Sequence, residues 1–461
     1  MKRLRSLSVI LIIVFLIQML QVLPLAADES FYARKDENTY RIRTTYIVAN
    51  TGSYSAYNIR VMVRLGVSSS SPYQTNLSYF VEPAADIIKR DAAGNIFGEI
   101  VFHELKPGEK KTISVDKYFA NSGISYSEEI YNIDCDYSSF KNNPTKAFYL
   151  QPSEKIESSS VEIKEKLRDF NLKKAAAKLA KDIYDFVNLH IDYDSSSLYA
   201  NKGALSGLLN KKGVCDEYAS LFTALCRAAG IPARVVSGYW IDESIKSGEW
   251  MNISGKRHAW SEFFVEGVGW VPAEPTLLYT YNGIRKPNSE YFANIKPSDR
   301  HFITGYTGKK AYSELSMYYA CYEDTTVSAR FGDEKIIRVD NYSGKSYFTD
   351  INTSWAKSFI DKLYNQGVIF GSGDTFEPTL NITRAEFSAY LVNALGLEEG
   401  DASLKFKDVT SDHRLAEFIN IAASNGLIKG YQGYFRPEDY LSRQDAAVIM
   451  ERAIKLVNKD T

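Results

Sequence analysis

Three side chains in the middle of the chain have the types and spacing that nucleophilic catalysis requires. Cys215 opens the run 215–229, whose apolar spacing and stop at Gly230 predict a helix. At a helix N-terminus the free N–H groups and the helix dipole favour a thiolate, the reactive form of cysteine. Gly213 is expected to let the backbone turn sharply into this helix. A cysteine in this position is more often structural, so Cys215 becomes a candidate nucleophile only with a base nearby.

His258 and Glu274 supply the expected base and the group that orients it. His258 opens the strand-like run 258–265, and Glu274 follows the strand-like run 269–273, with Gly267 at the turn between them. A hairpin at this turn places Glu274 beside His258, where a carboxylate can hold the imidazole in the productive tautomer. The backbone N–H of Cys215 is the first expected oxyanion donor. The pattern predicts a Cys-His-Glu site that forms a thioester by acyl transfer.

These residues resemble the transglutaminase-like cysteine enzyme family. The similar blocks are Gly213-Val214-Cys215, 230–239, His258-Ala259-Trp260 and 269–276, which appear in the family's order within residues 165–285. The resemblance implies a papain-like α+β core, here 160–300, whose cysteine attacks an amide carbonyl of a protein or peptide substrate. The histidine then acts as general base and general acid, and an Asp orients it. Glu274 stands where the family usually has Asp, so the backbone must absorb the extra methylene.

The segments around this core read as β structure. Residues 28–150 contain two long strand patterns, 40–48 and 57–65, separated by a turn at 50–53. In the second strand, Ile59, Val61, Val63 and Leu65 alternate with polar residues and are expected to face a core. This spacing predicts an all-β sandwich of immunoglobulin type, which carries no chemistry and serves as a spacer or a partner-binding module. Residues 301–344 are expected to be a β-rich connector.

The last part of the chain repeats at an offset of 58–59 residues. Phe348-Thr349-Asp350 recurs as Phe406-Lys407-Asp408, and 382–386 recurs as 441–445. The two units, 345–400 and 401–461, resemble S-layer homology (SLH) modules built from helices. The resemblance implies binding to pyruvylated secondary cell-wall polysaccharide of a Gram-positive-type bacterium. The family often uses three modules, so an oligomer could complete the SLH assembly. The implied polysaccharide-binding residues are Asp350, Trp355, Arg384, Glu386, Asp408 and Arg443.

Two arginines in these repeats call for a specific explanation. Thr383 and Glu386 fit a capping box, in which the two residues satisfy each other's backbone N–H groups. Arg384 and Arg443, however, fall in the first turn of their helices, where the dipole disfavours a cation. Because this occurs twice, each arginine is expected to meet an external anion such as an acidic glycan group. The alternative is an arginine paired within the protein.

The first residues of the chain indicate where the protein is located, and the composition excludes several classes of protein. Residues 1–27 read as a secretory signal peptide cut after Ala27, with an uncleaved membrane anchor as the alternative. The 55 Lys and Arg nearly balance the 56 Asp and Glu among 461 residues, which excludes a strongly basic nucleic-acid binder. Four cysteines exclude a disulfide scaffold, and pairing of Cys135 with Cys321 stays open. The scattered histidines predict no metal site and no cofactor.

The combined prediction is a secreted, wall-anchored cysteine enzyme of three domains. Water as acceptor of the acyl group would give hydrolysis, and an amine would give cross-linking. Hydrolysis is the favoured outcome, because no feature that would exclude water is visible in the sequence. The alternative is a non-catalytic surface adhesin or assembly protein that uses the same fold as a binding module.

Overall fold

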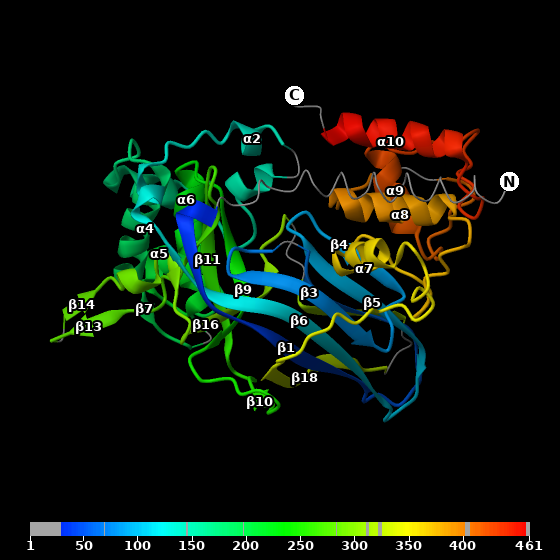
Figure 1. The fold of residues 1–461 in the computed structure, drawn as a ribbon, viewed down its shortest axis with the longest axis horizontal. Coiled ribbons are helices and arrows are strands. Elements are labelled where there is room, and N and C mark those ends of the chain that lie inside the picture. The colour runs from blue at the N-terminus through cyan, green and yellow to red at the C-terminus, as the bar shows by residue number, and fades with distance from the viewer. Residues whose placement is uncertain are drawn as a thin grey trace.

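The computed structural model describes residues 29–457, except 69, 144–145, 197, 283, 310–312, 321–324 and 402–405. Its fold is mixed β and α (Figure 1). A β-rich body lies in the centre, one group of helices covers the side of α4 and α6, and the C-terminal helices α7–α10 lie at the opposite side. The expected signal segment, 1–27, falls outside the described residues. Within the described ranges, no helix has the length and apolar character needed to cross a membrane.

The β-rich body consists of two sheets. One has the order β10-β18-β1-β6-β15, with β3 also paired to β6, and the other has the order β17-β2-β5-β4. The two short edge strands are β10 (Met251–Asn252) and β15 (Asn294–Ile295). The strands from the first part of the chain are β1 (Tyr32–Asn50), β2 (Ala56–Val67), β3 (Gln74–Glu82), β4 (Ile87–Arg90), β5 (Asn95–Leu105) and β6 (Lys110–Tyr126). The two-sheet arrangement agrees with the expected β-rich domain, whereas the immunoglobulin-type topology stays a prediction.

The alternation expected in β2 is present, but its second face is exposed only at Asn58 and Arg60 and is covered further along the strand. Ile59, Val61, Val63 and Leu65 are fully buried in the core between the sheets. Met62 and Arg64 on the opposite face are also buried, because other parts of the molecule cover this face. Met62 lies under the C-terminal helices and Arg64 lies against the central core.

Within the segment 301–344, expected to be a β-rich connector, the described residues include three strands that belong to the sheets. β16 (Arg300–Tyr306) pairs with a strand of the central core, while β17 (Leu315–Ala320) pairs with β2 and β18 (Val327–Arg338) pairs with β1. In the β1–β18 pair, Ile42 stands opposite Ile336. The chain therefore leaves the β domain, builds the central core and returns to complete both sheets. Such long-range pairing leaves no local pattern from which the sequence could predict it.

The central core is a four-stranded antiparallel sheet with helices on it. The strand order is β12-β11-β9-β16, formed by β9 (Ala233–Ile241), β11 (Arg257–Val265), β12 (Gly269–Ala273) and β16. Helices α4 (Ala176–His190), α5 (Ala204–Asn210) and α6 (Cys215–Ala228) share its hydrophobic core. The predicted helix at 215–229 is confirmed, and Gly230 follows its C-terminal end with a positive φ of 85°.

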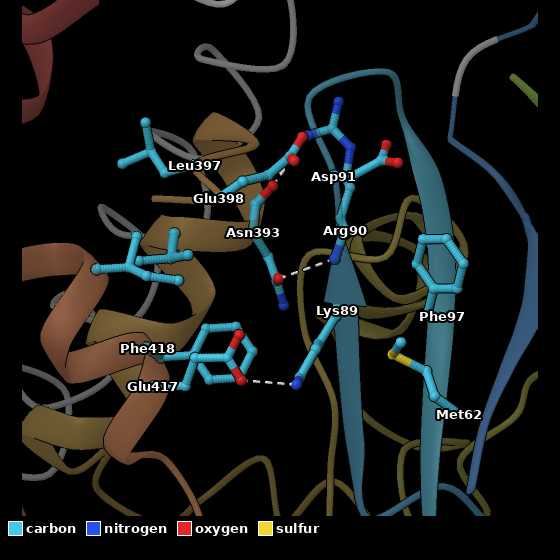
Figure 2. A pocket seen from close by; sticks show the side chains of 12 residues that line it. Met62, Lys89, Arg90, Asp91, Phe97, Asn393, Leu397, Glu398, Glu417 and Phe418 are labelled. Carbon is cyan, nitrogen blue, oxygen red and sulfur yellow. Dashed lines mark hydrogen bonds and ion pairs between the residues drawn. The ribbon is translucent and has the colours of Figure 1, made fainter. Parts of the chain in front are cut away.

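The C-terminal helices dock on the β domain rather than extend from it. These helices are α7 (Lys357–Asn365), α8 (Arg384–Leu395), α9 (Ala416–Ser424) and α10 (Arg443–Val457), and they share one hydrophobic core with β2, β4 and β5. Figure 2 shows the contact from close by: the Asn393 side chain accepts a hydrogen bond from the Arg90 backbone N–H (3.1 Å), and both residues line a small pocket of about 30 Å³. The Arg90 guanidinium donates to the carbonyls of Asn393 and Ala394, 3.0 Å from each, and thereby caps the end of α8.

Candidate active site

Cys215 is the first residue of α6, as expected, and Glu217 holds the loop that leads to it. The Glu217 carboxylate accepts hydrogen bonds from the backbone N–H groups of Val214 (3.0 Å), Lys202 (2.5 Å) and Gly203 (3.2 Å). Gly213 is needed for space and not for a left-handed turn, because its φ is not positive and a Cβ would lie 2.4 Å from the Cβ of Glu217. The Cys215 side chain is half-buried at the edge of the core.

His258 lies between Cys215 and Glu274. Its Nε2 is 2.5 Å from Oε2 of Glu274, and Cys215 is a further hydrogen-bond partner of the ring. The β11–β12 hairpin turns at Gly267, with Ser261 opposite Ala273. This register sets Glu274 diagonally across from His258 rather than directly opposite, a separation that the longer glutamate side chain spans. The structure thus brings together all three residues predicted for the site.

The electrostatics of this pair favour a protonated imidazole beside an ionised carboxylate. Burial by itself would lower the pKa of His258, but the Glu274 carboxylate and the Cys215 sulfur outweigh burial and raise this pKa to about 10. Burial would raise the pKa of Glu274, yet His258 and His301 hold it well below its usual range. His258 therefore keeps a proton at neutral pH that it can deliver to a leaving group.

Two aromatic side chains near the site were not singled out from the sequence. His301, on β16, is fully buried, and its Nε2 lies 3.3 Å from Oε2 of Glu274. Trp240, on β9, has its ring centroid 5.7 Å from that of His258, and its buried indole N–H has no hydrogen-bond partner among the described residues. The scarcity of histidine, five in the chain, was the one available hint to His301.

The donor atoms of His258, Glu274 and His301 lie within 4.8 Å of one another, a spacing at which a metal ion can be considered. Two ligands of one tetrahedral zinc ion stand about 3.3 Å apart when each bond is about 2.0 Å. The 2.5 Å between His258 Nε2 and Glu274 Oε2 is shorter and matches a charge-assisted hydrogen bond. We therefore assign the contact between His258 and Glu274 to a hydrogen bond.

A polar pocket of about 200 Å³ begins at Asp216, the residue after Cys215. Its wall combines α6 and β9 of the core with Arg64 and Asn95 of the β domain. The Arg64 guanidinium donates to the Ser237 hydroxyl (3.1 Å) at this wall. The β domain, expected to be a spacer or partner-binding module, therefore contributes side chains to a pocket that also includes the residue after the candidate nucleophile.

The remaining cysteines differ from Cys215 in their surroundings. Cys226 is fully buried within α6, and burial raises the pKa of its thiol, as expected for a core residue. Cys135 has a free thiol, and Cys321 lies outside the described residues. The open question of a Cys135–Cys321 pair therefore falls outside the described part of the chain.

Three of the acids predicted to bind polysaccharide hold the backbone of the repeats. Asp350 accepts hydrogen bonds from the N–H groups of Phe376 (2.9 Å) and Glu377 (2.7 Å). Asp408 does the same in the second repeat, with Phe435 (2.8 Å) and Arg436 (2.7 Å). Glu386 forms the expected capping box with Thr383. These contacts give the three carboxylates a structural role in each repeat.

The two arginines of the repeats have different environments. Arg384 is paired within the protein, against the expectation of an external anion: it forms an ion pair with Asp445 (3.1 Å) and donates to the Phe435 carbonyl (3.0 Å). The partner comes from the other repeat, so the helix dipole is offset by a contact between modules. Arg443 is exposed and has no such partner in the described part of the chain, and Trp355 is 60% exposed.

Family models match two parts of the chain. The transglutaminase-like superfamily matches residues 165–275, and the S-layer homology domain matches 347–388 and 405–447. The chain therefore contains a transglutaminase-like domain followed by two C-terminal S-layer homology domains. His301 lies beyond the residues matched by the transglutaminase-like model.

Curated relatives share limited parts of the chain. An amylopullulanase of Thermoanaerobacterium thermosulfurigenes is 34% identical over 24% of this chain and 6% of its own length. The surface-layer 125 kDa protein of Lysinibacillus sphaericus is 36% identical over 23% of this chain and 9% of its own. The chain thus spans less than a tenth of the length of either relative. A solved structure titled a putative cysteine protease, from Cytophaga hutchinsonii, is similar at 15% identity with a TM-score of 0.41, covering 67% of this chain and all of that one.

Proposed function

We propose that this protein is a surface-associated enzyme that uses Cys215 to attack amide bonds of proteins or peptides. The observation that carries the proposal is the Cys215–His258–Glu274 arrangement at the start of α6, with Nε2 of His258 2.5 Å from the Glu274 carboxylate. Because Glu274 engages Nε2, the other ring nitrogen is left for Cys215. This places a proton donor beside the thiolate and an anion behind the imidazolium.

In the first half-reaction, the Cys215 thiolate attacks the carbonyl carbon of the substrate amide. A carbon–sulfur bond forms, and the carbonyl oxygen takes the negative charge. The Cys215 backbone N–H, at the N-terminus of α6, is one donor to this oxygen. When the carbon–nitrogen bond breaks, His258 donates its proton to the leaving amine, and a thioester remains.

In the second half-reaction, the thioester is resolved by an acceptor. Neutral His258 removes a proton from water or from an amine, which attacks the thioester carbonyl and releases the Cys215 thiolate. Water gives hydrolysis and an amine gives a new amide bond. Hydrolysis is our proposal, because the pocket beside Asp216 is polar and open to water.

Labelling tests the nucleophile directly. An electrophilic peptide-amide mimic is expected to modify the full chain at Cys215 at least a hundred times faster than it modifies Cys215→Ala at pH 7, because Cys215 has an imidazolium partner and the other described cysteines do not. The site of modification is read by mass spectrometry of the digested protein.

Cys135→Ala is the matched control, because this second free thiol is also half-buried but lies outside the arrangement. The control should label as fast as the wild type. Equal labelling of wild type and Cys215→Ala would contradict the enzyme proposal and favour the alternative, a binding module. The contribution of Arg64 and Asn95 to the pocket is compatible with that alternative, since a ligand could bind there without reaction.

We further propose that the protein is secreted through its N-terminal segment and held at the cell wall by its SLH domains. The two SLH matches and the similarity to surface-layer proteins support this location. Pyruvylated secondary cell-wall polysaccharide is the proposed ligand. Of the residues expected to bind it, Asp350, Trp355 and Arg443 are exposed. The Asp350 carboxylate already accepts two backbone N–H groups, so Trp355 and Arg443 are the proposed contacts.

Sedimentation with purified wall that retains its polysaccharide tests this assignment. Trp355→Ala combined with Arg443→Ala is expected to lower retention at least tenfold, because it removes an exposed ring and an exposed cation. Tyr431→Ala combined with Lys429→Ala is the matched control, replacing another exposed aromatic and another exposed cation in the same region. Retention unchanged by the first pair would contradict the proposed contacts.

A further inference from the structure

His301 reaches the candidate active site from a strand outside the matched transglutaminase-like residues. It lies on β16, where it pairs with Trp240 of β9, and its side chain is fully buried. Its backbone carbonyl accepts a hydrogen bond from the Asn121 side chain (2.9 Å) of the β domain. Its ring stands edge-on to the Trp260 indole, with centroids 5.0 Å apart. The ring is thus held from several sides.

Both ring nitrogens of His301 face oxygen atoms that can only accept hydrogen bonds. Nδ1 lies 3.0 Å from the backbone carbonyl of Asp299, and Nε2 lies 3.3 Å from Oε2 of Glu274. A neutral imidazole has one N–H and could satisfy only one of these oxygens. An imidazolium has two N–H groups and can donate to both oxygens.

The Glu274 carboxylate is saturated by this arrangement. Oε1 accepts from the Thr276 backbone N–H (2.8 Å), while Oε2 accepts from both His258 (2.5 Å) and His301 (3.3 Å). An aspartate would be shorter by about one carbon–carbon bond of 1.5 Å and could not reach both rings from the same backbone position. The length of the Glu274 side chain therefore lets one carboxylate contact both His258 and His301.

Charge balance gives His301 a role beyond packing. In the reactive state Cys215 and Glu274 are negative and His258 is positive, which would leave one uncompensated negative charge in a largely buried site. A positive His301 brings the sum to zero. The ionisable groups that face the His301 ring in the described contacts are Glu274 and His258, and the Asp216 carboxyl also interacts with His258.

We propose that His301 is a positioning residue that holds the Glu274 carboxylate and, through its positive charge, stabilises the Cys215 thiolate in a Cys215–His258–Glu274–His301 array. This inference rests on the proposed function of Cys215. It assigns the segment after residue 300 a part in the chemistry of the core, in addition to its part in the sheets.

Alkylation of the full chain by iodoacetamide between pH 4 and 9 tests the proposal, with the rate of Cys215→Ala subtracted as background. His301→Phe and His301→Gln both lack the charge, whereas the glutamine can still donate to Glu274. In both variants, the pH at which the alkylation rate increases is expected to be at least one unit higher than in the wild type. The rate at pH 6 should fall about tenfold. Thermal unfolding measured in parallel shows whether each variant is folded, and His301→Gln decides if the phenylalanine variant is not.

The possible outcomes separate this inference from the proposed function. A pH profile unchanged in His301→Gln overturns the claim that charge is the contribution of His301. Profiles unchanged in both variants overturn the whole proposal for this residue. A wild-type rate no higher than that of Cys215→Ala overturns the proposed function itself, whatever the variants do.

Discussion

The Glu274→Gln variant is expected to lose on the order of a thousandfold or more in the rate at which Cys215 reacts with an amide-mimic probe at pH 7. The carboxylate accepts the His258 N–H at 2.5 Å and is the main cause of the raised pKa of that histidine. The neutral amide of glutamine can still accept the His258 N–H, but it does not attract the positive charge of the imidazolium as the carboxylate does. The imidazolium and the thiolate beside it are then both less favoured. The measurement is the second-order rate constant for labelling, compared with the wild type.

Glu266→Gln is the matched control for this experiment. Glu266 lies at the turn of the same β11–β12 hairpin, is exposed, and accepts a hydrogen bond from the Asp136 backbone N–H (2.7 Å). The same change of acid to amide should leave labelling within about twofold of the wild type, since surface substitutions have small effects. A Glu274→Gln rate close to that of Glu266→Gln would show that the carboxylate does not activate the site.

The His258–Glu274 pair also makes the stability of the protein depend on pH. The pKa of His258 is raised from 6.5 to about 10, so its contribution to the free energy of unfolding is fully present below pH 6.5 and is lost as the pH rises through about 10. The pKa of Glu274 is lowered from 4.5, so its contribution is present above pH 4.5 and is lost as the pH falls through the folded-state value. The wild type should therefore lose more stability than Glu274→Gln on acidification below pH 4.5, as measured by thermal unfolding.

The largest loss of stability is expected from Glu262→Ala, which leaves Arg234 buried without a counter-charge. The two side chains are almost inaccessible to solvent and form an ion pair of 2.6 Å. Arg234 lies between the rings of Trp270 (4.1 Å) and Tyr306 (3.6 Å), so it cannot turn to solvent without breaking this stack. Removal of one member of a buried pair costs about 3–5 kcal/mol. The free energy of unfolding in urea, followed by tryptophan fluorescence, measures the effect.

Tyr73→Phe is the control within the same network. The Tyr73 hydroxyl, from the β domain, donates to Glu262 (2.7 Å) and accepts from the Trp260 indole N–H (2.9 Å). Its removal leaves the ion pair intact and should cost about 1–3 kcal/mol. If Glu262→Ala destabilises no more than Tyr73→Phe, the buried charge of Arg234 is compensated by groups other than Glu262.

The local parts of the candidate site could be predicted from the sequence because short-range rules decide them. The start of α6 at Cys215 follows from its apolar spacing and from Gly230 at the other end. The approach of Glu274 to His258 follows from one hairpin, whose turn lies at Gly267. The duplicated SLH pattern was visible for the same reason, since each repeat carries its own sequence motif and the first repeat also carries a capping box.

The features that only the tertiary structure decided are those that join distant segments. His301 comes to Glu274 because β16 pairs with β9, and no local pattern marks that pairing. Arg384 finds Asp445, 61 residues further along, which removes the need for an external anion at that position. β17 and β18 return to the β domain, and Arg90 caps α8 across the domain contact.

The sequence by itself therefore determined which residues could react, since helix capping, hairpin turns and residue chemistry act over a few positions. Only the tertiary structure decided what surrounds them: a second histidine on the carboxylate, β-domain side chains in the neighbouring pocket, and an SLH region docked on a sheet. These contacts depend on which apolar faces of the helices and sheets pack against each other. Many sequences with the same local patterns could pack these faces in a different arrangement.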